Sequence, residues 1–129
     1  MSVPVHVLNW YYGWAAIGVG FLTGAGIGLF FHREDFLGGY ASFRRRILRL
    51  GHIALPALGI INLLFSLSSW PAPEATSTQV ASVCLVVGGI TMSSVCFLCA
   101  WRQAFRYLFI IPVSTLIVAV ACVLLEAAR

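Results

Sequence analysis

Four long apolar runs dominate this sequence, and each is about as long as a membrane is thick. They cover residues of about 10–31, 50–70, 80–101 and 107–125. A helix rises about 1.5 Å per residue, so about 20 apolar residues cross the roughly 30 Å hydrocarbon core of a bilayer. The sequence therefore predicts an all-α integral membrane protein with four transmembrane helices.

The composition makes lipid the natural surroundings of this chain. Of its 129 residues, 60% are apolar and 9% are charged, and the mean hydropathy is +0.96. A soluble domain has about 45–50% apolar and about 25% charged residues. Burying so much apolar surface in so short a chain would leave little to face water, so we expect a single membrane domain over residues 1–129 with the lipid bilayer as its partner.

The arginines predict which ends of the helices face the cytoplasm. The net charge of +4 comes from eight arginines against four acidic residues, and the chain has no lysine. They cluster in the connections 32–49 and 102–106, whereas the connection 71–78 (PAPEATST) has none. Basic residues favour cytoplasmic loops, so both chain termini are expected outside the cytoplasm. Short connections then predict an antiparallel, up-down-up-down four-helix bundle.

The same arginines bear on location and partners. At helix ends they set orientation and meet anionic lipid headgroups, so no nucleic-acid partner is expected. Short multi-pass chains without lysine-rich targeting segments are ordinary in the bacterial inner membrane, which is the expected location.

Small residues form one stripe on the first span and another on the third. The stripe on the first span consists of Ala16, Gly20, Gly24 and Gly28, and that on the third of Ser82, Gly89, Ser93 and Cys96. Such stripes let two helix backbones approach closely, and we expect these two to pack against each other. Two small-residue faces in one four-helix chain also suggest a homo-oligomer or a subunit of a larger membrane complex.

The second span has a polar and small stripe of its own. His52, Gly59, Asn62 and Ser66 share one face at 100° per residue. Polar groups inside a membrane turn towards other helices or a cavity. We therefore expect Asn62 either to form an interhelical hydrogen bond or to line a ligand site.

Few groups suited to catalysis converge in this pattern. The carboxylates, which are Glu34, Asp35, Glu74 and Glu126, all lie outside the predicted spans. A proton-coupled exporter would need one within a span, so this class is disfavoured. Cys96 and Cys99 form a CxxC pattern, but hydrocarbon around both thiols predicts a structural role.

The histidines give the strongest indication of a cofactor. His32 follows the first span and His52 opens the second, so both are expected at the cytoplasmic rim. Neutral imidazole ligates haem iron or copper, and Arg45 and Arg49 at the same level could pair with haem propionates. In the alternative interpretation, His32 is solvated and His52 hydrogen-bonds a neighbouring helix or a lipid headgroup.

The layout also resembles a known family. The residues that carry the resemblance are Phe43, Arg45, Arg46, Arg49, Pro56, Gly59 and Pro112. In their order along the chain they are similar to the small four-helix protoporphyrinogen oxidases of bacteria and their copper-resistance-like relatives. The resemblance implies haem or redox neighbours. Those oxidases have a histidine in the first span and a histidine or lysine in the third, which this chain does not have.

Three functional hypotheses follow. The preferred one is a non-catalytic accessory or scaffolding subunit that packs through its small-residue helix faces. The second is a haem- or metal-binding redox protein that uses His52, with His32 as a second ligand. The third is a small-solute channel or transporter lined by Asn62, Ser66, Thr91 and Ser93.

Overall fold

The computed structural model describes residues 4–128, so positions 1–3 and 129 of the predicted domain lie outside the described residues. The described chain is helical throughout its regular structure. Its elements are α1 (Val5–Phe30), η1 (Phe36–Gly38), α2 (Phe43–Leu67), α3 (Thr76–Trp101), η2 (Gln103–Phe109) and α4 (Ile110–Ala127), where η marks a 3-10 helix. Four helices are long and apolar enough to cross a membrane, which confirms this part of the prediction.

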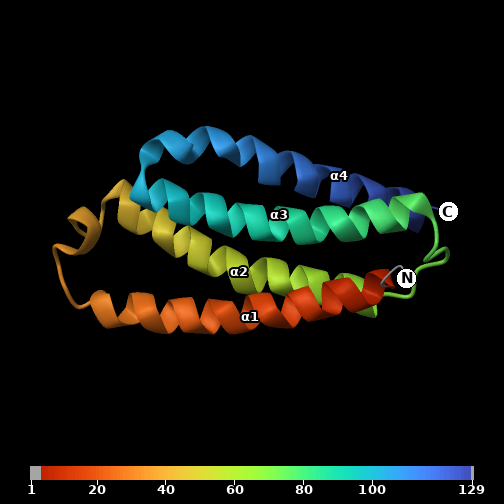
Figure 1. Cartoon of the computed structure of the whole chain (residues 1–129), viewed down its shortest axis with the longest axis horizontal. Helices are drawn as coiled ribbons and strands as arrows, with labels where there is room; N and C mark the ends of the chain where they lie inside the picture. The colour runs from red at the N-terminus through yellow and green to blue at the C-terminus, as the bar shows by residue number, and fades with distance from the viewer. Residues whose placement is uncertain (1–3, 129) are drawn as a thin grey trace.

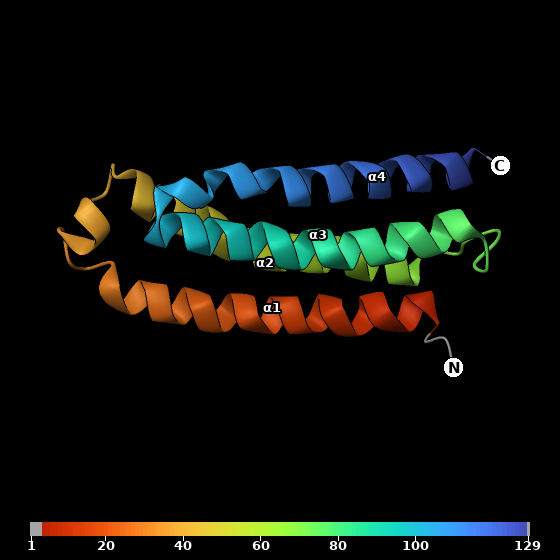
Figure 2. The same ribbon diagram turned by 45° about the horizontal axis from the view of Figure 1, so that its top comes forward.

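The helices lie side by side along one long axis. The start of α1, the α2–α3 connection and the end of α4 lie at one end of the molecule, whereas η1 and the α3–α4 connection lie at the other (Figure 1). In both views α1 and α4 flank the α2–α3 pair (Figure 2). In the most apolar 18-residue stretch of each helix, 44% of the residues of α3 are buried, but only 11% in the stretch that includes α4. Helix α3 is therefore the centre of the molecule.

The arginine-rich segment belongs to α2. This helix begins at Phe43, well before the predicted span, because Ser42 caps its first turn. The Ser42 hydroxyl accepts a hydrogen bond from the backbone N–H of Arg45 at 3.2 Å. Before the cap, Gly38 and Gly39 have φ values of 87° and 91°, which glycine adopts without strain and which turn the chain back towards α2.

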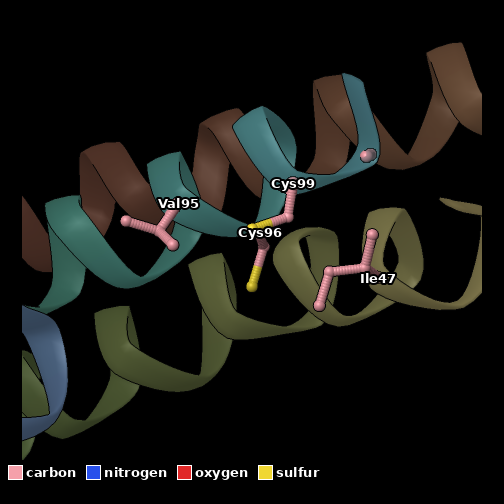
Figure 3. Close-up of a cluster of buried hydrophobic side chains, with 5 residues drawn as sticks. Ile47, Val95, Cys96 and Cys99 are labelled. Carbon is pink, nitrogen blue, oxygen red and sulfur yellow. The ribbon is translucent and has the colours of Figure 1, made fainter. Parts of the chain in front are cut away.

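Two apolar clusters fill the contacts around α3. The first consists of Ile47, Val95, Cys96, Cys99 and Ala100, and the second of Phe65, Ala81, Leu85 and Ala119. In Figure 3 the Cys96 side chain extends from α3 towards α2. There, a Cβ on Gly51 would lie 2.8 Å from the Cβ of Cys96. The CxxC cysteines therefore lie at a close helix crossing, and both are free thiols.

The small stripe of α1 packs against α2, not α3. A Cβ on Gly20 would lie 2.9 Å from Cδ of Pro56, and one on Gly24 would lie 2.7 Å from Cε1 of His52. About two turns nearer the start of α1, a Cβ on Gly59 would lie 2.8 Å from the carbonyl oxygen of Gly13. The expected pairing of this stripe with α3 is therefore wrong. Periodicity places residues on one helix face, but it does not specify which helix that face meets.

The last member of the stripe has no helix opposite it. Gly28, like Gly18 and Gly26, has no atom within 4 Å of the position of an added Cβ. The reason is geometric, because α2 diverges from α1 towards the η1 end (Figure 1). Gly28 therefore packs against no atom of the described residues, and its predicted packing role is left for a helix from outside the chain.

Candidate functional site

A buried network of polar side chains joins α1, α2 and α3. The side-chain amide of Asn9 donates to Oδ1 of Asn62 at 2.7 Å and to the backbone oxygen of Ser82 at 3.3 Å. In return, the hydroxyl of Ser82 donates to Oδ1 of Asn9. All three side chains have an exposed fraction of 0%. The network fixes the three helices in one register and satisfies its own polar groups.

The network confirms one of the two expectations for Asn62, which is an interhelical hydrogen bond. It also contains Asn9, which the sequence reasoning missed because the first span was started at Trp10. The signal was available: Asn9, Tyr12 and Ala16 share one helix face, so starting the helix one turn earlier would have placed an amide beside Asn62.

Of the three hydroxyls proposed to line a channel, those of Ser66 and Thr91 bond their own helices, whereas that of Ser93 has no hydrogen-bond partner among the described residues. Ser66 donates to the backbone oxygen of Leu63 at 2.7 Å, and Thr91 donates to that of Val87 at 2.7 Å. Such bonds to the preceding turn satisfy a hydroxyl without a neighbour. Asn62 is held in the network, and the channel hypothesis remains a prediction.

His52 lies against α1. Its Nδ1 is 3.2 Å from the hydroxyl of Thr23, and its ring occupies the space beside Gly24. His32 is exposed beyond the end of α1. At 1.5 Å per residue, the chain between Gly24 and His32 corresponds to about 12 Å. His32 therefore lies about two helical turns nearer the η1 end of the molecule than His52 does.

The arginines cap the ends of other helices. Arg45 is 4% exposed, and its Nη2 donates to the backbone oxygen of Phe31 at 3.0 Å, just after the end of α1. Arg44 donates through Nε to the backbone oxygen of Ala100 at 2.7 Å, at the end of α3. Cations stabilise helix C-termini, where carbonyls lack partners. The arginines at the start of α2 therefore join this helix to the ends of α1 and α3.

The four residues predicted to hold a haem each have a definite place in the structure. His52 contacts Thr23, Arg45 binds a backbone carbonyl, and Arg49 stacks on the ring of Tyr40 with its guanidinium carbon 4.7 Å from the ring centre. The haem or metal site remains a prediction.

Glu126 lies inside a helix, contrary to the expectation that it follows the last span. It belongs to the last turn of α4, its exposed fraction is 1%, and it accepts a hydrogen bond from the hydroxyl of Ser77. Ser77 is in the first turn of α3. The carboxylate therefore lies at a helix N-terminus, where negative charge is stabilised.

Two cavities follow the side of α1 that faces α3. The larger, about 380 Å³, has apolar walls that include Ile27, Phe30 and Leu48. The second, about 280 Å³, lies between Tyr12 and Ser93, whose hydroxyl oxygens are buried without a hydrogen-bond partner among the described residues. Phe97 lines both cavities. Because both cavities lie along α1 and share Phe97, we call the pair the groove.

The residues described so far define a helical protein of membrane-spanning dimensions with a buried polar network and an apolar groove. A scan against protein-family models, a search of curated proteins and a search of solved structures each found no match for this chain. The function is therefore argued from the geometry of the chain.

Proposed function

We propose that this chain is a multi-pass protein of the bacterial inner membrane that acts as a non-catalytic accessory or scaffolding subunit. Its four helices cross the membrane in up-down-up-down order, with both termini outside the cytoplasm. Support for this orientation comes from the arginines of α2 and of the α3–α4 connection, which gather at the η1 end of the molecule (Figure 1). The opposite connection, PAPEATST, has no basic residue.

The observation that carries the proposed role is the open glycine face of α1. Gly18 and Gly28 have no atom within 4 Å of an added Cβ, and Ala25, which lies between them, is exposed. In contrast, glycines such as Gly13 and Gly20 have a neighbouring helix within 3 Å of that position, at 2.6 and 2.9 Å. Glycine in a membrane helix permits close backbone approach by another helix. The open face therefore suits a helix from outside this chain.

The use of the polar side chains agrees with a non-catalytic role. The buried amides and Ser82 satisfy one another between helices, and the buried Arg45 caps α1. Catalysis needs a nucleophile, an acid or a base that converges on a substrate site.

The test replaces both open glycines. The variant Gly18→Leu/Gly28→Leu adds side chains where the isolated chain has space, so the chain should fold normally while a partner helix loses its close approach. Affinity purification from native membranes, followed by quantitative mass spectrometry, should recover a second copy or a partner subunit with the wild type and much less with this variant.

The matched control is Gly26→Leu, which is equally open within the chain but lies on the groove wall and should keep the partner. The proposal fails if the wild-type protein behaves as a monomer in mild detergent and co-purifies with nothing. It also fails if the double variant retains the same association.

A further inference from the structure

The groove along α1 is long, and its walls are mainly apolar apart from the hydroxyls of Tyr12 and Ser93. Its α1 wall is formed in turn by Ala15, Val19, Thr23, Ile27 and Phe30. These residues recur at every helical turn and cover about 22 Å along the helix axis at 1.5 Å per residue. Its length and apolar walls match an extended hydrocarbon chain better than a compact ligand.

The groove ends near the arginines at the start of α2, which we call the basic rim. Its last residues on α2 and α3 are Leu48 and Phe97. About one turn further towards the rim, Arg44 lies beyond Leu48 and donates through Nε to the backbone oxygen of Ala100, which follows Phe97. The two terminal nitrogens of Arg44 have no hydrogen-bond partner among residues 4–128. A cation with free donors is therefore held at the mouth of the groove.

The charge at this mouth is not balanced by the chain itself. Glu34 and Asp35 are exposed in the connection before η1, and neither forms an ion pair with an arginine in the described part of the chain. Arginines 33, 44, 45, 46 and 49 outnumber these two acids in the same connection and the first turns of α2. Arg45 and Arg49 are stacked on aromatic rings, whereas Arg44 and Arg46 are exposed.

We propose that this groove is a binding site for one anionic phospholipid, with an acyl chain along α1 and the phosphate at Arg44. Basic pockets between membrane helices on the cytoplasmic side bind anionic headgroups. Arginine suits this role because its planar donors match phosphate oxygens. The groove supplies the chain-binding half of the site and the unbalanced rim supplies the headgroup-binding half. The site does not depend on a partner subunit.

The first test compares two lipids that differ only in headgroup charge. Wild-type protein in detergent is titrated with phosphatidylglycerol or with phosphatidylcholine of the same acyl chains, and native mass spectrometry counts the bound lipids. One tightly retained phosphatidylglycerol is expected, with phosphatidylcholine bound at least fivefold more weakly, the effect of about one arginine at a membrane surface. Equal retention of the two lipids overturns the proposal.

The second test fills the groove. Gly26 lies on its wall and has open space where a Cβ would be, so Gly26→Leu adds a side chain to the groove without disturbing a helix contact. This variant should lose about tenfold or more in phosphatidylglycerol binding. Gly28→Leu is the matched control on the same helix, because it is equally open but does not line the groove, and it should bind as the wild type does. Loss in both variants, or in neither, overturns the assignment to the groove.

The third test removes the headgroup contact. Arg44→Gln keeps a donor for the Ala100 carbonyl but removes the charge, so the preference for phosphatidylglycerol should fall about fivefold. The control is Arg106→Gln on η2, whose guanidinium interacts with the ring of its neighbour Tyr107. An unchanged preference in Arg44→Gln rejects this arginine as the phosphate ligand. Thermal unfolding of each variant verifies that the fold is intact, and the wild-type lipid comparison stands without any variant.

Discussion

Replacing Asn62 with leucine should destabilise the protein by about 2 kcal/mol, and the buried network shows why. Leucine has nearly the shape of asparagine, so the change removes hydrogen bonds without leaving a cavity. The main loss is the 2.7 Å bond from Asn9, which joins α1 to α2. Hydrogen bonds between membrane helices contribute about 0.6 kcal/mol on average and up to about 1.7 kcal/mol.

The remainder of the cost comes from Asn9. Without Asn62, its buried amide nitrogen keeps only the longer 3.3 Å bond to the backbone oxygen of Ser82. A poorly satisfied buried polar group costs about 1 kcal/mol or more. The two contributions together give about 2 kcal/mol, which corresponds to roughly a thirtyfold change in the folding equilibrium.

A double-mutant cycle measures the pair directly. Asn9→Leu, Asn62→Leu and the double variant are unfolded reversibly in mixed micelles, and the free energy of unfolding is compared with that of the wild type. The double variant should lose about 1 kcal/mol less free energy of unfolding than the sum of the single variants. Both amides are absent from it, so no amide is left buried without its partner. Ser94→Ala is a suitable control, since its hydroxyl donates only to the backbone oxygen of Ile90 on its own helix, at 2.7 Å. A coupling energy below about 0.3 kcal/mol would refute the network.

Three further predictions concern the helix crossings and the alternative site. Gly59→Leu should lower the free energy of unfolding by about 2–3 kcal/mol, because its Cβ would lie 2.8 Å from the Gly13 carbonyl oxygen. The control Gly28→Leu should change that free energy by less than about 0.5 kcal/mol. Equal effects of the two variants in a denaturant titration would contradict the α1–α2 crossing. Cys96 and Cys99 each have an exposed fraction of 0%, so a membrane-permeant maleimide should label them only after unfolding, and fast labelling of the folded protein would show that α2 and α3 separate there. The haem hypothesis requires a Soret band in the absorption spectrum of the purified protein that is lost in His52→Ala. We expect no such band, and finding one would support haem binding.

The fold class follows from the sequence because it depends on local properties. Length, hydropathy and the absence of charge within a run are sufficient to predict a helix that can cross a membrane, and the structure has four such helices. The need of Asn62 for a partner was also predictable, since a buried amide in an apolar helix is costly to leave unsatisfied. The identity of the partner was not, because Asn9 was placed before the first span.

The choice of neighbours was decided only by the tertiary structure. The glycines of α1 were visible as a stripe, but the sequence contains nothing that distinguishes a match with α3 from the observed match with Pro56 and His52 on α2. Glu126 shows the same limit, because its burial against Ser77 depends on where α4 ends relative to α3.

The arginines at the start of α2 show most clearly what the sequence determines and what the tertiary structure decides. The charge of this segment and its position beside an apolar run predict from sequence alone which end of the helices faces the cytoplasm. Charge and hydropathy are additive properties of a segment, so they need no knowledge of its neighbours. Packing decides what each arginine does: Arg45 caps α1, Arg44 caps α3 at the mouth of the groove, and Arg49 stacks on Tyr40. Those roles depend on how α2 crosses its neighbours, and a crossing depends on side chains from separate segments that meet only in the folded chain.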